Sequence, residues 1–478
     1  MGIEDHLYKG LTYYQKLPSF FKKSLGFIYR NIPFWVRYGS LYSAYRKLIC
    51  RSEFWNDEQI EIFTLEMLKR TLVNAYENTT YFHDLFSSVN FNPSHFTEIK
   101  DLEKIPFTDK STLRTFKGGM ISKNISPDKL IYVTTGGTSG IPVEVYYTKG
   151  RERTREFVFM TDQWKRVGYK NGDRIARIRG TVVDYYGNNT FFRIEPIKNR
   201  LYLSSYDLYE ENFPLYIEKL QQFKPHFLHT YPSAIILLAK YIIVHEVMIE
   251  GLKAVLCSSE QFYPGQRELI EKAFNCRVYS WYGHTEYSTL AGECECSTDY
   301  HLYFQYGYTE LIDENGLTVT NPGIMGEIVG TSFEMKAFPV IRYRTGDYAE
   351  WVDGKCSCGR SYKLMTKVIG RWQQEKIITL KNSEISLTAL NMHSGIFDNV
   401  IQYQFYQREI GKVTLRIIKN KKFSEGDEKK ITRSFKEKFR NLVEFNIEYV
   451  NDISRTQRGK HKFLISELPE TCNNLHSN

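Results

Sequence analysis

The spacing of apolar and polar residues changes along the chain. Residues 57–105 carry apolar positions at the spacing of a helical face, as in EIFTLEMLKRTLVNAYENT. From about 130 to 350, short apolar runs such as KLIYV, RIARI and KAVLC separate helical segments. Strands that alternate with helices indicate a layered α/β architecture. After residue 305, the segments GYTELIDENGLTV and GEIVGTSF are typical of β-hairpins.

A second unit is predicted after the break near 369–376. The strands VIQYQFYQ, KVTLRIIK and FNIEYV and the charged helix EGDEKKITRSFKEKFRNLV form a pattern typical of a compact α+β domain of about a hundred residues. We therefore predict an α/β fold, with a large multi-layer domain followed by a small α+β domain. The expected parts are a basic, aromatic helical arm at 1–56, a large domain at 57–369, a hinge at 370–374 and a small domain at 375–478.

Composition narrows the class of protein. Hydrophobic residues make up 42% and charged residues 25%, and the net charge of +9 is spread thinly, without a nucleic-acid-binding module. We find no apolar core of a signal peptide and no run long enough to span a membrane, so a cytoplasmic location is expected. The best candidate run, AIILLAKYIIVHEVMI at 234–249, contains charged residues and predicts a buried helix. Eight cysteines in such a chain indicate metal ligands or reduced thiols rather than disulfides.

The arm contains FFKKSLGFIYRNIPFWVRYG. The favoured interpretation is a helical arm that packs its rings on the main domain. The alternative is peripheral docking on anionic lipid at the inner face of a membrane, because basic and aromatic residues together suit that interface.

The stretch 132–145, YVTTGGTSGIPVEV, places small hydroxyl residues and glycines between two strand-like runs. Successive Gly and Ser/Thr residues let backbone N–H groups converge on one point, which suits phosphate oxygens. It is not a P-loop, because no Lys-Ser/Thr pair follows the last glycine. Taken alone, the stretch also fits a flexible Gly/Ser loop.

Four further stretches follow in order: YGHTE at 282–286, YRTGD at 343–347, GR at 370–371 and RTQRGK at 455–460. Together, over about residues 75–465, they resemble the adenylate-forming superfamily of acyl-CoA ligases, luciferases and peptide-synthetase adenylation domains. Within it, the chain looks like the phenylacetate–CoA ligase and CapK-type branch. The stretches that support this branch are YENTTYFHDLF, LEKIPFTDKSTLR, KPHFLHTYPSAI, AGECE and YHLYFQYGYTELIDENG.

The resemblance implies ATP and Mg²⁺ as cofactors and assigns residues to them. The phosphate-binding loop is expected to use Thr134, Thr135, Gly136, Gly137, Thr138, Ser139 and Gly140. Many relatives have Lys after the loop proline, where this chain has Val143. Tyr282, followed by Gly283, is expected to stack on adenine, Thr285 to touch the α-phosphate, and Glu286 to hold Mg²⁺ through its carboxylate.

The remaining positions concern the ribose, the hinge and the small domain. Asp347 is expected to accept hydrogen bonds from both ribose hydroxyls, and Ser259 and Glu260 to line the adenine pocket, with a looser match to the family. Arg371 is expected to contact the nucleotide at the hinge, although the usual hinge Asp or Lys is replaced by Gln373. Lys460 is expected to be the catalytic lysine that stabilises charge as the acid attacks the α-phosphate.

A set of cysteines and one histidine forms a candidate metal site. Its members are Cys294, Cys296, His301, Cys356 and Cys358, and four of them suffice for a tetrahedral Cys3His zinc site between two loops. Reduced thiols without metal are the alternative. The resemblance implies that Cys294, His301, Cys356 and Cys358 are the ligands of a structural zinc, with Cys296 as the competitor of Cys294.

The resemblance implies an AMP-forming ligase that converts a carboxylate to an acyl-adenylate and transfers it to an amine or CoA. CapK-type relatives are associated with capsule and other surface polysaccharides, which points to an acyl or uronic-acid substrate. An aromatic-acid CoA ligase is the runner-up. A non-catalytic nucleotide-binding relative and a membrane-docked adaptor are rivals. The specificity pocket is expected near Tyr231–Ser233 and Arg177–Gly180; the oligomeric state is not predicted.

Overall fold

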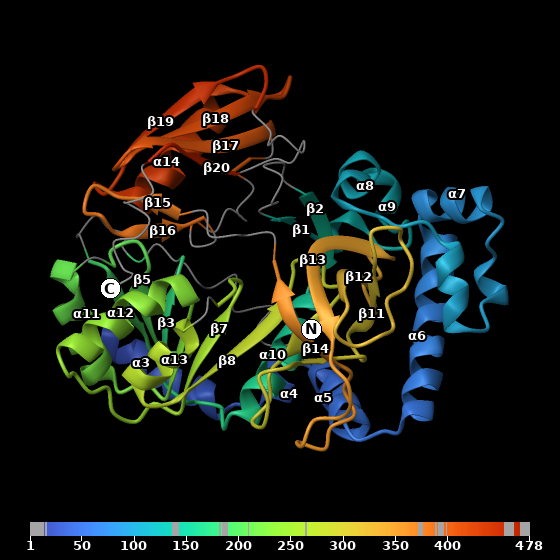
Figure 1. Ribbon diagram of the computed structural model, residues 1–478, viewed down its shortest axis with the longest axis horizontal. Coiled ribbons are helices and arrows are strands. Elements are labelled where there is room, and N and C mark those ends of the chain that lie inside the picture. Colours follow the sequence, from blue (N-terminus) through green and yellow to red (C-terminus); the bar gives the residue numbers. More distant parts are fainter. Residues whose placement is uncertain are drawn as a thin grey trace.

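The computed structural model describes residue 14 and residues 17–135, 143–180, 183, 190–208, 210–262, 265–370, 376–387, 390, 396–397, 399–453 and 463–468. Helices flank one broad sheet in a large lower body, and the C-terminal strands form a smaller body above it (Figure 1). The predicted fold class, a large α/β unit followed by a small α+β unit, is confirmed.

Helices form the N-terminal part of the chain, as the apolar spacing predicts. They are α3 (Ser19–Asn31), α4 (Phe34–Tyr38), α5 (Ser40–Ser52), α6 (Asp57–Asn78), α7 (Thr80–Ser88), α8 (Lys110–Thr115) and α9 (Lys117–Met120), with 3₁₀ turns η2 (Pro93–His95), η3 (Ile99–Lys104) and η4 (Pro127–Lys129). The long helix α6 begins at a capping box, in which Asn56 and Gln59 each accept a backbone N–H of the other. Leu68, Leu72 and Ala75 form its buried stripe.

The large sheet has the order β11-β12-β13-β14-β10-β9-β8-β7-β6-β3-β5-β4 among the described residues. Its parallel centre comprises β8, β7, β6, β3 and β5, and antiparallel strands extend both sides. The strands are β3 (Ile175–Arg179), β4 (Phe192–Glu195), β5 (Arg200–Ser204), β6 (Phe227–Thr230), β7 (Ala254–Ser258), β8 (Arg277–Gly283), β9 (Leu290–Gly292), β10 (Tyr300–Leu302), β11 (Gly307–Ile312), β12 (Met325–Ser332), β13 (Tyr343–Trp351) and β14 (Leu364–Ile369).

The two faces of the parallel centre are covered differently. One face packs on α11 (Phe213–Phe223), α12 (Pro232–Val244) and α13 (Gln266–Phe274), and includes Ala176 and Ile178 of β3. The turn η5 (Glu210–Asn212) leads into α11. The other face contacts Trp164 of α10 (Glu152–Arg166). Because side chains alternate along a strand, Arg177 and Arg179 lie on this second face.

A separate hairpin joins β1 (Leu130–Thr135) to β2 (Val143–Thr148), with Thr135 opposite Val143. The small unit contains the pair β15 (Lys376–Ile378) and β16 (Glu384–Ser386), and a sheet of order β19-β18-β17-β20. Its remaining elements are β17 (Val400–Glu409), β18 (Lys412–Lys419), α14 (Glu425–Phe439), β19 (Glu444–Tyr449) and β20 (Leu464–Ser466). Ile431, Phe435 and Phe439 of α14 are buried in its core.

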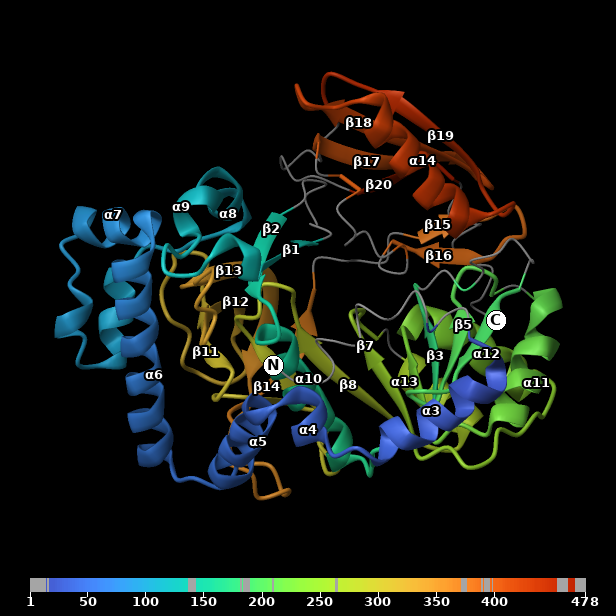
Figure 2. The same cartoon turned by 180° about the vertical axis from the view of Figure 1, so that it is seen from behind.

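The N-terminal helices α3, α4 and α5 run along the lower edge of the large body in the view from behind (Figure 2). The Arg30 guanidinium donates to the backbone carbonyls of Pro196 and Ile197. Farther along the arm, the ring of Tyr38 stacks on Phe157 with centroids 4.1 Å apart. None of the helices that the structure describes has both the length and the apolar character needed to cross a membrane.

Candidate functional site

Residues of the YGHTE and YRTGD motifs and of the segment after β7 meet around one cavity at the carboxyl ends of β7 and β8. The cavity has a volume of about 440 Å³. Its lining includes Ser259, Glu260, Tyr282, Gly283, Thr285, Glu286 and Asp347 from the sequence prediction. Segments that are up to 88 residues apart in the chain therefore contribute to one pocket because β13 and β14 lie in the same sheet as β8.

Glu286 is buried at the wall of this cavity, with 4% of its surface exposed. Its Oε1 accepts a hydrogen bond from the Tyr343 hydroxyl at 2.7 Å, and its Oε2 lies 3.2 Å from His284 Nδ1. Burial alone would raise the pKa of Glu286, but hydrogen bonds and charge from His284, the charge of Lys110 and the Tyr343 hydroxyl outweigh burial and lower it to about 2. The carboxylate is therefore ionised at neutral pH and suited to a hard cation.

Asp347, in β13, also lines this cavity. Its Oδ2 accepts a hydrogen bond from the Tyr282 hydroxyl at 3.0 Å, and its backbone N–H donates to Thr345 Oγ1 at 3.0 Å. Thr345 Oγ1 in turn donates to the Ile328 carbonyl in the neighbouring strand. The predicted adenine and ribose residues are thus in direct contact, and Asp347 is held by the sheet. A Cβ on Gly370 would lie 3.9 Å from Asp347 Oδ1, so the predicted hinge begins beside this carboxylate.

Ser259 and Glu260 follow β7 directly. Ser259 has a left-handed backbone with φ of 68°, which turns the chain at the cavity wall. Glu260 accepts hydrogen bonds from the backbone N–H and the hydroxyl of Ser233, at 2.9 and 3.0 Å. Ser233 lies in the first turn of α12, where a carboxylate stabilises the unpaired N–H groups. Both Glu260 oxygens therefore also fix the start of a helix.

The β1–β2 hairpin lies against the YGHTE segment. The Tyr147 hydroxyl of β2 donates to the Thr285 carbonyl, and the Tyr147 ring stacks on Tyr287 with centroids 4.8 Å apart. Thr134 is buried in β1, with 2% exposed, and Thr135 ends that strand. The other predicted loop residues, together with Arg371 and Lys460, lie outside the described residues: Gly136, Gly137, Thr138, Ser139 and Gly140.

The cavity also contains residues that the sequence prediction missed. Lys110, the first residue of α8, lines it and acts on Glu286 through its charge. Trp281 and Lys367 also line it. Lys110 belongs to the stretch LEKIPFTDKSTLR, which supported the family resemblance without assigning any of its residues to the site.

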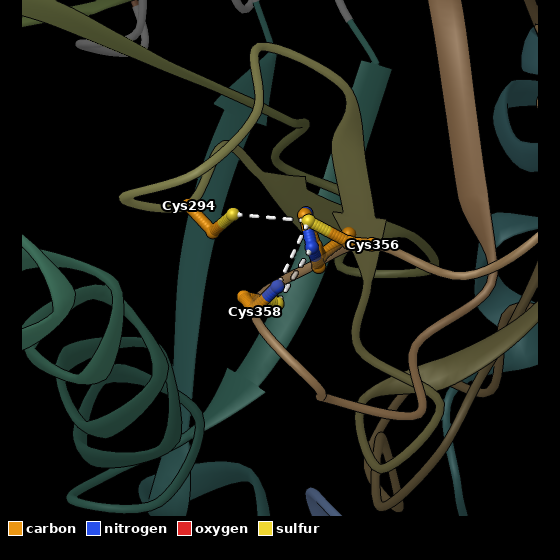
Figure 3. A group of neighbouring side chains, drawn as sticks. Cys294, Cys356 and Cys358 are labelled. Atoms are coloured by element: carbon orange, nitrogen blue, oxygen red, sulfur yellow. Dashed lines mark hydrogen bonds between the residues drawn. The ribbon is translucent and has the colours of Figure 1, made fainter.

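The predicted metal ligands lie together beside the strands β9, β10 and β14, and Figure 3 shows the three cysteines among them. The ligand atoms of Cys294, His301, Cys356 and Cys358 all lie within 4.8 Å of one another. Cys294 Sγ is 3.6 Å from Cys356 Sγ, and Cys358 Sγ is 3.4 Å from His301 Nε2. Tetrahedral zinc with ordinary bond lengths would separate two sulfurs by about 3.8 Å and a sulfur from a nitrogen by about 3.6 Å. The four donors fit that geometry.

Hydrogen bonds around the cluster favour Cys294 over Cys296. The Cys296 thiol is exposed, whereas its backbone N–H donates to Cys294 Sγ at 3.2 Å. His301 Nδ1 lies 3.0 Å from the Asp299 carbonyl, which can only accept. Nδ1 therefore carries the proton, and the lone pair of Nε2 faces the sulfur atoms.

Several known proteins are similar to this chain. Residues 377–467 match the family model of the CapK C-terminal domain. The chain is 25% identical over 403 residues to Protein CapK from Staphylococcus aureus, a match that covers 82% of this chain and 86% of the relative. It is 26% identical over 344 residues to a phenylacetate-coenzyme A ligase from Pseudomonas putida, covering 70% and 76%.

Solved structures share the fold. A crystal structure of 2-hydroxyisobutyryl-CoA ligase in the postadenylation state with 2-HIB-AMP superposes with a TM-score of 0.56 at 19% identity, covering 88% of this chain and 92% of that one. These matches confirm the predicted resemblance to the ligases of the adenylate-forming superfamily. Within that superfamily, the chain is similar to CapK and to phenylacetate–CoA ligases, as its motifs predict.

Proposed function

We propose that the protein uses ATP to activate a carboxylic acid as an acyl-adenylate and transfers the acyl group to an amine or CoA. The observation that carries the proposal is the meeting of Thr285, Glu286, Tyr282 and Asp347 around one cavity. In the first step a carboxylate oxygen bonds to the α-phosphorus while the bond to the bridging oxygen breaks, so pyrophosphate leaves. In the second step the amine nitrogen or thiol sulfur attacks the acyl carbon, and AMP leaves.

Each residue would have its own role in these two steps. Asp347, fixed by the sheet and by Tyr282, would accept hydrogen bonds from the ribose hydroxyls. Glu286 would hold Mg²⁺, whose charge offsets that of the phosphates. Lys110 would add a cation beside the same phosphates. Following the family resemblance, Arg371 would contact the nucleotide at the hinge 370–374, and Lys460 would be brought into the site by rotation of the small domain.

The proposed context is surface polysaccharide biosynthesis, as implied by the resemblance to CapK-type proteins. The Protein CapK match extends over more of the chain than the phenylacetate ligase match, 82% against 70%. An aromatic acid with CoA as acceptor is the alternative, supported by the phenylacetate-coenzyme A ligase relatives.

The test is pyrophosphate release from ATP with hydroxylamine as trap. Aromatic acids, fatty acids, amino acids and hexuronic acids, free and nucleotide-linked, would be compared. Release of pyrophosphate and AMP together with a hydroxamate for one class supports the proposal and names that class. Release of ADP and phosphate would refute the mechanism. Tight ATP binding without turnover across all classes would favour the non-catalytic alternative.

We also propose that Cys294, His301, Cys356 and Cys358 hold one zinc ion. The site would be structural, because four protein ligands leave no open position for a substrate. It would tie the loop after β9 to the loop between β13 and β14.

A contact with a membrane surface is proposed for the arm. In α3, Phe20, Phe21, Phe27 and Ile28 are 74%, 57%, 67% and 60% exposed, and α4 adds Trp35 at 61%. A helix with so many exposed large apolar side chains on one segment, interleaved with Lys22 and Lys23, suits the interface of an anionic bilayer.

Vesicle sedimentation would test this contact. The double variant Phe20→Ser, Phe27→Ser should weaken binding to anionic vesicles by about tenfold or more, since each ring loses burial worth about 1.5–3 kcal/mol. Phe54→Ser, which changes a ring that is 61% exposed outside α3, is the matched control. Equal binding of all three proteins, or no preference for anionic over neutral vesicles, would contradict the proposal.

A further inference from the structure

A group of cations lies on the face of the sheet that carries Arg177 and Arg179. In the parallel register, Arg177 lies between Tyr202 of β5 and His229 of β6, and Arg200 is opposite Ile175. Since paired residues point to the same face, Arg177, Arg179, Arg200 and His229 share this surface. The edge strand β4 adds Arg193, opposite Tyr202, and one carboxylate, Glu195, opposite Arg200.

Arg179 is held by neutral groups. Its guanidinium donates to the hydroxyls of Ser258 and Ser259, at 2.9 and 3.0 Å, and lies over the Tyr231 ring at 4.4 Å. It also contacts His229 Nε2. Burial, and then the charges of the neighbouring arginines, hold the pKa of His229 well below its ordinary value, so the neutral ring can accept from Arg179.

Fewer neighbouring groups offset the positive charge of Arg177. Burial, followed by the charge of Arg179, lowers its pKa to about 10, and Arg200 acts in the same direction. The Nε atoms of Arg177 and Arg179 are buried and have no hydrogen-bond partner among the described residues. Among the described residues, no carboxylate forms an ion pair with Arg177, Arg179 or Arg200. Buried cations without counter-ions are costly, and packing alone does not need several together.

The surface that carries these cations adjoins the nucleotide cavity. Ser259 accepts from Arg179 and also lines the cavity. Trp281 lines the cavity as well, and its ring centroid is 5.4 Å from that of His229. An acid whose carboxylate reaches the α-phosphate at Thr285 can extend its other end past Ser259 toward the arginines.

We infer that the acid substrate carries a second anionic group, a carboxylate or a phosphate, which Arg177 and Arg179 bind. The inference rests on the proposed function and deepens it. A planar guanidinium pair with free N–H donors matches either oxyanion. A monocarboxylate such as phenylacetate would leave these cations uncompensated, so the inference disfavours the aromatic-acid alternative.

Ligand-induced thermal shifts test the inference without requiring turnover. The full chain is saturated with AMP to occupy the nucleotide cavity. Glutarate, phosphonoacetate and butyrate are then compared; the first two carry a second carboxylate or phosphonate, and the third carries none. We expect the dianionic probes to raise the unfolding midpoint more than butyrate does. Arg177→Gln should remove this difference, whereas Arg416→Gln, at an arginine paired with Glu448 in the small unit, should preserve it.

Equal shifts from all three probes, or a difference that survives both Arg177→Gln and Arg179→Gln, would overturn the inference. A larger shift from phosphonoacetate than from glutarate would identify phosphate as the second group. In the hydroxamate assay, Arg177→Gln should lower kcat/KM for dianionic acids by about tenfold or more and change that for monocarboxylates by less than about twofold. If the dianionic probes raise the unfolding midpoint more than butyrate does but no acid releases pyrophosphate, only the ligase function is refuted and the anion site stands.

Discussion

The cysteine cluster allows a matched comparison of two neighbouring cysteines. Cys294 Sγ lies among the predicted ligands, whereas the Cys296 thiol is exposed and only its backbone N–H contacts the cluster. We expect Cys294→Ser to lose zinc and Cys296→Ser to keep it. Because the two substitutions remove the same atom two residues apart, a general effect of thiol loss or of the loop sequence cannot produce that difference.

The size of the effect follows from the geometry and from mass action. The observed separations of 3.6 Å between two sulfurs and 3.4 Å from sulfur to nitrogen are each about 0.2 Å below those of a tetrahedral zinc site, so little rearrangement is needed on binding. At free zinc a hundredfold above Kd, binding stabilises the folded state by about 2.7 kcal/mol. For a unit as large as the predicted domain 57–369, that corresponds to a fall of about 3–4 °C in the unfolding midpoint when the metal is lost.

The assay is metal content per chain together with thermal unfolding, before and after chelation. Wild type and Cys296→Ser should contain about one zinc and lose stability with chelator. Cys294→Ser should contain little zinc, and chelator should leave its midpoint unchanged. A metal-free wild-type preparation that does not take up zinc would refute the site, and zinc retained by Cys294→Ser but lost by Cys296→Ser would refute the choice of ligand.

Three further outcomes are expected. Lys460→Ala should abolish adenylation while ATP still binds, and Lys462→Ala should not; adenylation by Lys460→Ala at the wild-type rate would show that another group stabilises the transition state. Asp347→Ala should weaken ATP binding by at least about tenfold in calorimetry, since charge-assisted hydrogen bonds are worth about 1.5–3 kcal/mol; an unchanged Kd would exclude the ribose contact. Burial lowers the pKa of Lys438 to about 8, so the folded state binds fewer protons than the unfolded state between about pH 8 and 10.5. Lys438→Met should therefore raise the free energy of unfolding by up to about 3 kcal/mol at pH 7, a gain that fades toward pH 10.5; a gain independent of pH would contradict the role of the charge.

Much of the fold is encoded locally. The apolar runs at 130–135, 175–179 and 254–258 form β1, β3 and β7, and the charged segment after Ser424 forms α14 behind a capping box. The sequence pattern did not predict that hairpin strands such as β11 and β12 extend the same sheet as the parallel strands. That arrangement depends on contacts between distant segments rather than on local periodicity.

The candidate site, like the fold, could be predicted from the sequence only in part. Motif order predicted the cavity residues Tyr282, Glu286 and Asp347, because the family spacing labels them. Lys110 has no motif of its own and was found only through its position beside the cavity. The family resemblance already favoured Cys294 over Cys296. The coordinates add the physical reason, because Cys294 Sγ lies with the other three ligand atoms and Cys296 is exposed. Glu260 was predicted as a nucleotide contact, and its bonds to Ser233 became visible only in the fold.

Two ion pairs link the small unit to the segment of the large unit that follows β5. Arg440, after α14, pairs with Asp207 at 3.1 Å, and both side chains are mostly buried. Lys381 reaches Glu211 at 3.5 Å in a more exposed pair. A rotation of the small unit between two half-reactions would have to expose the first pair to water, where its attraction is weak. Asp207→Asn should therefore shorten the time spent in this orientation, as single-molecule fluorescence between the two units would show, and an unchanged dwell time would exclude this pair as the barrier. The interval between adenylation and acyl transfer would then be set partly by one ion pair remote from the reacting atoms.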